Sequence, residues 1–332
     1  MRGKNKINIG VDLLGSDMRP SDLFEAVLIF SKELKPSVHL TLFGTPQLFG
    51  RRRPPNNVTF FPVKEVIEMD DAPLTAIRRK RNSSICLGIK QLKEGELDAF
   101  ISAGNTGALM GCAKITLPSL AKVERPALLT LLPTRKNEIA VLDVGANTTY
   151  KAKHLVQFAA MGVAYQRSRG VKAPKVGLLN IGSEAKKGTP ELQETYNLLQ
   201  KKSNFVGNIE ARDVFQGEID VLVTDGFTGN VFLKTAEGIA SVILEEIESS
   251  ISIDECTPHN KGVLAELRSR LHYAEYPGAL LCGVDGIVIK CHGNASPQSL
   301  TRSIVTAHRL VEHAFLKSVA KELKGKSHSK LP

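Results

Sequence analysis

Short loops that combine glycine with asparagine, serine or threonine recur along the chain, each directly after an apolar run. The first is Ser102-Ala103-Gly104-Asn105-Thr106-Gly107. Glycine lets the backbone approach a ligand closely, and the N–H groups that open a following helix favour a negative charge. Such loops are typical of sites that bind phosphate. Four others have a similar composition: Gly145-Ala146-Asn147, Gly182-Ser183-Glu184, Asp225-Gly226-Phe227-Thr228-Gly229-Asn230 and His292-Gly293-Asn294.

Taken alone, any one of these loops could be an ordinary turn between a strand and a helix, since glycine and asparagine favour turns. Five of them favour a binding site. In an open parallel sheet, ligands bind in the crevice outside the carboxyl ends of the strands. We therefore expect the five loops to lie at the same edge of a sheet and to converge on one cleft that holds an anion.

Ionisable side chains beside the loops are the candidates for catalysis. Lys187 follows Gly182 closely enough to reach a phosphate held there, although it could also be an ordinary solvated lysine. His292 lies at a strand end, where an imidazole could donate to phosphate, protonate a leaving group or serve a structural role.

Carboxylates also flank the loops. Asp12 and Asp17 follow the first apolar run and could orient basic residues. Asp225 could cap the turn that it begins or anchor a lysine. Because no third oxygen ligand stands at a clear spacing, we expect no metal ion.

Several nucleotide and nucleophile motifs are missing from the sequence. No G-x-G-x-x-G follows the first apolar run, and the run Gly177–Gly182 has P-loop spacing but continues with Ser183 where that motif requires lysine. No G-x-S-x-G occurs, so a covalent serine intermediate is not indicated. We expect no cofactor. The cysteines form no C-x-x-C pair, and we interpret them as reduced packing residues: Cys86, Cys112, Cys256, Cys282 and Cys291.

The chain of 332 residues carries a formal charge of +10, which favours acidic partners. Its basic clusters include Arg78-Arg79-Lys80-Arg81. Nucleic acid is not expected, because there is no tryptophan and no basic cluster is interleaved with aromatic residues for stacking. No apolar run reaches the roughly 18 residues of a membrane span, so we expect a cytoplasmic protein.

Apolar β-rich runs alternate with helical patterns, which predicts a three-layer α/β/α fold around a mainly parallel sheet. We expect one domain over residues 1–322, a helical protrusion near 250–277, and a disordered basic tail over 323–332. The expected strands are 7–14, 38–43, 58–61, 98–103, 127–132, 139–144, 176–181, 219–224 and 287–291. The expected helices are 21–34, 74–92, 108–120, 151–168, 191–200, 229–248, 262–273 and 297–322.

The chain resembles the PlsX family of bacterial phosphate acyltransferases. The matching stretches occur in order along nearly the whole chain: Ile67–Pro73, Ser102–Leu109, Leu142–Asn147, Gly177–Gly182 with Lys187-Gly188, Asn208–Asp213, Asp225–Lys234 and Ile289–Gly293. Two loops depart from the family pattern. Asp12-Leu13-Leu14-Gly15-Ser16-Asp17 stands in place of Asp-Ala-Met-Gly-Gly-Asp, and Glu275-Tyr276-Pro277-Gly278-Ala279 in place of Glu-Tyr-Gly-Gly-Ala.

The resemblance implies a fold like that of phosphotransacetylases and isocitrate or isopropylmalate dehydrogenases. It also implies transfer of a long-chain acyl group from acyl carrier protein to inorganic phosphate for phospholipid synthesis, a homodimer, and loose association with the membrane. Acyl carrier protein is acidic, so Arg78, Arg79, Lys80 and Arg81 are its expected docking cluster. The segment 262–273 could pack in a core or dimer, or touch an anionic membrane.

For this reaction we expect a phosphate oxygen to attack the thioester carbon directly, while asparagine or backbone donors stabilise the oxyanion. Two alternatives stay open: a phosphotransacetylase-like enzyme that uses acyl-coenzyme A, and a non-catalytic adaptor that binds acyl carrier protein or nucleic acid. The predicted catalytic residues are Lys187, His292 and Asn180. The predicted substrate-binding residues are Asp12, Asp17, Ser102, Gly104, Asn105, Thr106, Asn147, Gly182, Asp225, Thr228, Asn230 and Gly293.

Overall fold

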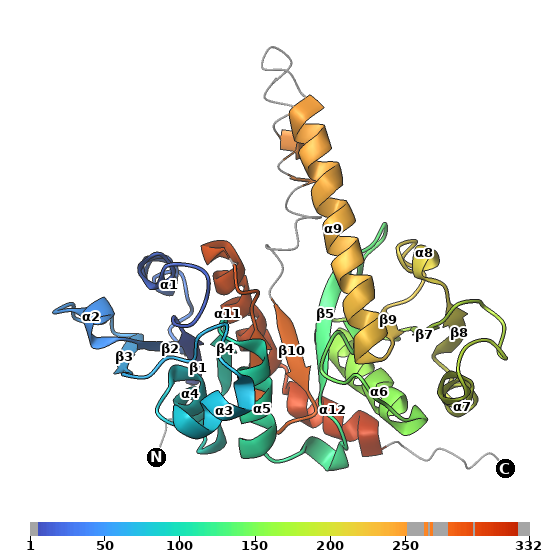
Figure 1. Cartoon of the computed structure of the whole chain (residues 1–332), viewed down its shortest axis with the longest axis horizontal. Coiled ribbons are helices and arrows are strands. Elements are labelled where there is room, and N and C mark those ends of the chain that lie inside the picture. The colour runs from blue at the N-terminus through green and yellow to red at the C-terminus, as the bar shows by residue number, and fades with distance from the viewer. Residues whose placement is uncertain (1–5, 251–261, 265, 268–277, 295, 325–332) are drawn as a thin grey trace.

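A computed structural model describes residues 6–250, 262–264, 266–267, 278–294 and 296–324. One sheet of 11 strands runs through the molecule in the order β3-β2-β1-β4-β11-β10-β5-β6-β9-β7-β8 (Figure 1). The strands are β1 (Ile7–Asp12), β2 (Val38–Gly44), β3 (Val58–Pro62), β4 (Ala99–Ser102), β5 (Ala127–Pro133), β6 (Glu138–Leu142), β7 (Val176–Leu179), β8 (Phe205–Ile209), β9 (Val221–Val223), β10 (Ala279–Cys282) and β11 (Ile287–Lys290).

Helices cover both faces of the sheet. The α-helices are α1 (Pro20–Ser31), α2 (Pro46–Phe49), α3 (Pro73–Arg79), α4 (Ser84–Lys93), α5 (Thr106–Thr116), α6 (Ala152–Ser168), α7 (Pro190–Leu199), α8 (Ala211–Val214), α9 (Gly226–Ser250), α11 (Pro297–Glu312) and α12 (Phe315–Lys324). Residues of α1, α6, α11 and α12 pack in one hydrophobic cluster, and residues of α3, α4 and α5 pack in another. Successive residues of a strand point to opposite faces, so Ile101 joins the first cluster and Phe100 the second.

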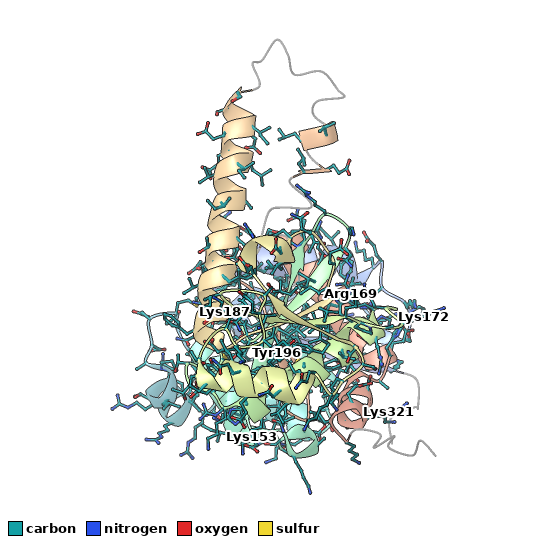
Figure 2. The ribbon with its side chains drawn as sticks, turned by 90° about the vertical axis from the view of Figure 1, so that its right-hand side faces the viewer. Lys153, Arg169, Lys172, Lys187, Tyr196 and Lys321 are labelled. Atoms are coloured by element: carbon teal, nitrogen blue, oxygen red, sulfur yellow. The ribbon has the colours of Figure 1, made fainter. Side chains whose placement is uncertain are left out.

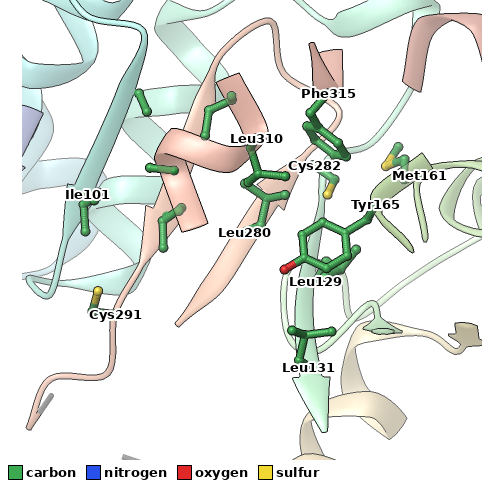
Figure 3. Close-up of a cluster of buried hydrophobic side chains, with 14 of the residues drawn as sticks. Ile101, Leu129, Leu131, Met161, Tyr165, Leu280, Cys282, Cys291, Leu310 and Phe315 are labelled. Carbon is green, nitrogen blue, oxygen red and sulfur yellow. The ribbon is translucent and has the colours of Figure 1, made fainter. Parts of the chain in front are cut away.

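The first cluster continues across the middle of the sheet. Figure 3 shows Leu129 and Leu280 on neighbouring strands, with Tyr165 of α6 and Phe315 of α12 beside them. The rings of Tyr165 and Phe315 meet edge to face at 6.1 Å between centroids. Cys282 is also buried here, as expected for a packing cysteine. The sheet therefore holds its two halves together through a shared core.

The sheet is mainly parallel, but the strands of its two halves run in opposite directions. β10 pairs antiparallel with both β11 and β5, and β5 pairs antiparallel with β6. As a consequence β6, β9, β7 and β8 run opposite to β1, β4 and β11. The five glycine-containing loops therefore follow strands that end at opposite edges of the sheet, and the expectation that all five lie at one edge is wrong.

Two predicted helices are each divided in two. The predicted helix 74–92 ends at Arg79 and restarts after Ser83, whose hydroxyl accepts from the Cys86 N–H as an N-cap. The predicted helix 297–322 is interrupted at Ala314, which has a φ of 49°. Apolar spacing continues through both breaks, which is why the pattern predicts one helix.

Two strands were not predicted. β8 is an edge strand that contains Gly207 and Asn208, and β10 has only four residues. Both signals are weak, because glycine and asparagine are depleted in strands and short apolar runs are ambiguous. At the C-terminus, α12 includes residues 323 and 324, which were assigned to the tail. The remainder of that tail lies outside the described residues.

The long helix α9 leaves the body of the molecule, as Figure 1 shows in orange. Ile239, Val242 and Ile243 on its outer part are about half exposed. The predicted helix 262–273 is helical at 262–264 and 266–267, and the rest of it and of the predicted protrusion lies outside the described residues. Within the part of the chain that the structure describes, none of the helices has the length and apolar composition of a membrane span.

Candidate functional site

Three polar side chains form a row at the carboxyl ends of β1, β4 and β11. Asp12 stands in register with Ser102, and Ser102 with Lys290. All three are buried. The Ser102 hydroxyl donates to Asp12 Oδ2 at 2.8 Å and accepts from the Gly104 N–H at 3.1 Å. Burial raises the pKa of Asp12 to about 6, and the hydrogen bond from Ser102 opposes that rise. The predicted residues Asp12 and Ser102 are thus brought together.

Lys290 completes this row and was not singled out from the sequence. Its Nζ donates to the carbonyl of Ala103 at 3.2 Å and to the carbonyl of Cys291. Burial lowers the pKa of Lys290 to about 8, while Asp17 and Asp12 favour its charged form. The available signal was a lysine within an otherwise apolar strand, which is unusual because an unpaired buried charge is costly.

A cavity of about 290 Å³ opens beside this row. Its polar lining includes Thr106, Asn230, Lys234, Lys290 and His292. Its apolar lining includes Leu131, Pro133, Phe215, Leu233, Ala236 and Ala240. On α9 the two kinds of residue form adjacent stripes, because positions 230, 234 and 237 recur at helical spacing beside positions 233, 236 and 240. The cavity can therefore hold a polar group next to an apolar chain.

Loops from both halves of the sheet reach this cavity despite their opposite strand directions. Helix α9 starts at the carboxyl end of β9 and packs back over β6, so it runs in the direction of β11. It carries Asn230 and Lys234 towards the edge where β11 ends. Residues from both halves of the sheet thus meet at the cavity because of the course of α9, and not because their strands run in one direction.

Lys234 links α9 to the loop after β11. Its Nζ lies 2.7 Å from Glu237 Oε2 and 3.2 Å from His292 Nε2. Burial lowers the pKa of His292, and the charge of Lys234 lowers it further. A neutral imidazole can accept from the ammonium group, so the predicted residue His292 lies in the cavity as an oriented polar group.

The loop after β4 divides its residues between structure and cavity. Asn105 Oδ1 accepts from the Ala108 N–H at 3.0 Å and so caps α5. Its Nδ2 donates to the carbonyls of Glu68, Met69 and Asp71, each at 3.1 Å. Asn105 therefore anchors the neighbouring loop, whereas Thr106 lines the cavity.

The loops after β1 and β11 contact each other at Asp17 and Gly293. The Asp17 N–H donates to the Gly293 carbonyl at 3.0 Å. A Cβ atom at Gly293 would lie 2.5 Å from Asp17 Oδ2, so a larger residue would displace the Asp17 side chain. Gly293 itself lines the cavity.

The turn after β6 is built around Asp143, another residue that was not singled out. Its carboxylate accepts from the N–H groups of Leu128, Gly145, Ala146 and Asn147, and from the Asn147 side chain. Asn147 Nδ2 also donates to the Pro126 carbonyl at 2.7 Å. Asn147, which was predicted to bind substrate, thus uses its side chain to fix the turn.

The start of α9 is held in the same way. Asp225 Oδ1 accepts from the N–H groups of Phe227 and Thr228, each at 3.0 Å, as an N-cap. Thr228 is exposed, and only Asn230 of the predicted residues in this loop lines the cavity.

The loop after β7 lies outside the cavity lining. Asn180 Nδ2 donates to the Lys187 carbonyl at 3.1 Å, so Asn180 shapes this loop. Lys187 lies at the surface (Figure 2), where its Nζ is 3.9 Å from Glu184 Oε1. Gly182 is buried against the Lys187 side chain. The structure does not bring Lys187, Asn180 and Gly182 together with His292.

The predicted docking cluster lies at the end of α3 and just after it. Arg78 and Arg79 are exposed in the last turn of α3, which packs against α5. Lys80 Nζ pairs with Asp71 Oδ2 at 2.6 Å, and Arg81 Nε donates to the Arg78 carbonyl. Three cationic side chains therefore remain exposed beside the helix whose first residue lines the cavity.

Comparison with known proteins places these features in a family. The model of the fatty acid synthesis protein family matches residues 7–318. A phosphate acyltransferase of Desulfitobacterium hafniense (strain Y51) is 41% identical over 331 residues, covering 96% of this chain and 97% of the relative. A phosphate acyltransferase of Chlamydia pneumoniae is 38% identical over 331 residues, covering 96% and 99%.

Solved structures show the same fold at low sequence identity. A phosphotransacetylase from Staphylococcus aureus has a TM-score of 0.59 at 15% identity, covering 94% of each chain. A branched-chain phosphotransacylase from Enterococcus faecalis V583 has a TM-score of 0.60 at 13% identity, covering 92% of this chain and 99% of that one. A 4-hydroxythreonine-4-phosphate dehydrogenase from Klebsiella pneumoniae has a TM-score of 0.52 at 14% identity, with the same coverage. The predicted fold class is confirmed.

Proposed function

The chain belongs to the fatty acid synthesis protein family and is a phosphate acyltransferase, and from this premise we propose that it transfers acyl groups from acyl carrier protein to inorganic phosphate. In this reaction an oxygen of phosphate forms a bond to the thioester carbon. The carbon–sulfur bond breaks, and the sulfur leaves with the electron pair and takes up a proton. The products are an acyl phosphate and a free thiol.

The observation that carries this proposal is the composition of the cavity. Polar and apolar stripes of α9 face the same space, so a phosphate and an acyl chain can lie side by side. Holding the two reactants together removes much of the entropic barrier to their reaction. Thr106, Asn230 and His292 line this cavity. In our proposal Thr106 and Asn230 donate to the oxyanion, and His292 assists departure of the thiol.

Acyl carrier protein as the donor is supported by the exposed arginines of α3, Arg78 and Arg79. We expect replacement of both Arg78 and Arg79 by glutamate to raise the KM for acyl carrier protein donors about tenfold at low salt, because opposite charges speed encounter and hold the complex. Steady-state kinetics at several salt concentrations measure this effect, which should shrink as salt rises.

A double charge reversal elsewhere is the control for net charge. Lys172 and Lys321 lie on the side of the molecule seen in Figure 2, and their replacement by glutamate should leave the donor KM within about twofold. If both double variants weaken donor use equally, net charge and not a docking cluster explains the effect.

We propose that the acyl phosphate feeds phospholipid synthesis and that the chain forms a homodimer. The half-exposed apolar residues Ile239, Val242 and Ile243 of α9 offer a second copy or a lipid surface an apolar face. Peripheral contact with an anionic membrane through 262–273 concerns residues that lie mostly outside the described ones.

One assay tests the proposed reaction. Purified protein, palmitoyl-acyl carrier protein and phosphate should release free thiol, and hydroxylamine should trap the acyl phosphate as a hydroxamate. Release that does not depend on phosphate would contradict the proposal, and no release would favour the adaptor. Equal or better use of palmitoyl-coenzyme A would instead favour the phosphotransacetylase-like alternative.

A further inference from the structure

Lys290 is a buried cation whose surroundings use only part of its bonding capacity. Its side chain lies at the cavity wall with 7% of its surface exposed, and its Nζ donates to the carbonyls of Ala103 and Cys291. An ammonium group has three N–H donors. Two are directed to carbonyls, which leaves one for an occupant of the cavity.

Backbone carbonyls fix the Lys290 ammonium in place before any ligand arrives. Ser102 stands in register beside it, and Asp12 beside Ser102. Because the ammonium is held by backbone carbonyls on a strand end, it loses little conformational freedom on binding an anion. Its charge also acts more strongly in a buried position than at the surface.

We propose that Lys290 binds the phosphate substrate, so that phosphate lies between the end of β11 and the first turns of α9. This inference rests on the proposed function and says where phosphate, the acceptor of the acyl group, binds. Lys234 and Thr106 line the same space and offer further donors. The β7 loop offers a weaker site, because Lys187 is half exposed and faces Glu184.

Replacement of Lys290 by methionine tests the assignment, since methionine keeps the apolar stem and removes the charge. A charge-assisted hydrogen bond is lost, so we expect the KM for phosphate to rise at least about tenfold while the KM for the acyl donor stays within about twofold. Lys172→Met, at the surface in Figure 2, is the matched control and should change neither constant.

The pH dependence gives a second readout that does not depend on the methionine variant folding. Burial lowers the pKa of Lys290 to about 8, so the ammonium is lost above that pH and kcat/KM for phosphate should fall. The charged and titratable groups around Lys290 are Asp12, Asp17, Lys234 and Cys291. Lys290→Arg should keep its charge and move this decline to higher pH.

Direct binding of inorganic phosphate, followed by calorimetry without acyl donor, separates this inference from the reaction. If the wild type binds phosphate and Lys290→Met does not, the site is supported even where no acyl phosphate forms. If the wild type turns over and Lys290→Met has an unchanged phosphate KM, the assignment is wrong and the function stands. The assignment would also be overturned if the KM for phosphate rose in Lys187→Met but not in Lys290→Met. It would likewise be overturned if the alkaline decline of kcat/KM stayed at the same pH in Lys290→Arg.

Discussion

Replacement of Asp143 by alanine should lower the free energy of unfolding by about 4 kcal/mol or more, because it strands a group of buried hydrogen-bond donors. The carboxylate is fully buried and accepts four backbone N–H groups at 2.8–3.2 Å, together with the Asn147 side chain at 2.8 Å. The alanine variant leaves these donors without partners. It also removes the carboxylate that joins the strand at Leu128 to the 145–147 turn.

Urea unfolding followed by circular dichroism measures this loss. Asp143→Asn keeps one carbonyl oxygen and should show a smaller loss than alanine. Asp213→Ala is the matched control, because Asp213 is exposed, and it should change stability by no more than about 0.5 kcal/mol. Equal stability of the Asp143→Ala and Asp213→Ala variants would show that the hydrogen bonds around Asp143 do not hold this region.

Replacement of Gly229 by alanine should lower kcat/KM about a hundredfold, because it displaces the start of α9. A Cβ atom at this position would lie 1.9 Å from the Asp143 carbonyl oxygen, so the helix and the turn must separate by about 1 Å or more to restore ordinary contact. Asn230 and Lys234 would move with the helix, and an error of about 1 Å in position can cost about a hundredfold in rate.

A second glycine of the same helix provides the control. A Cβ atom at Gly238 meets nothing within 4 Å, and alanine favours helix over glycine by up to about 1 kcal/mol. Gly238→Ala should therefore keep its activity and gain slightly in stability. Kinetics and thermal unfolding of both variants measure these effects, and a fully active Gly229→Ala enzyme would mean that the position of α9 does not control the reaction.

Much of the site was predictable because its chemistry is local in sequence. Asp12 and Ser102 follow or end apolar runs that are strands in the structure, and His292 lies directly after such a run. A strand end followed by glycine and small polar residues can be identified from the sequence without knowing which strands pair with it. The same local pattern also singled out Asn105, Asn147 and Asp225, whose side chains fix loops by hydrogen bonds to backbone groups. A polar residue that caps a turn and one that binds a ligand have the same local pattern.

Lys290 shows where local patterns fail. Its strand reads Ile287-Val288-Ile289-Lys290, and the lysine at the end of an apolar run could have been a solvated strand terminus. Only the pairing of β11 with β4 and of β4 with β1 places it beside Ser102 and near Asp12. Burial, and the low pKa that follows from it, is likewise a property of the packed sheet.

The sequence by itself determined the α/β class, most of the strands and the glycine-containing loops, because hydrophobic period and turn composition act over a few residues. Strand direction was decided by the tertiary structure. The short strand β10 pairs antiparallel with both β11 and β5, so β5 keeps the direction of β11. The antiparallel pairing of β5 with β6 then reverses the half of the sheet that contains β6, β9, β7 and β8. The first turns of α9 and the loop after β11 then line one cavity, because α9 runs back towards the end of β11.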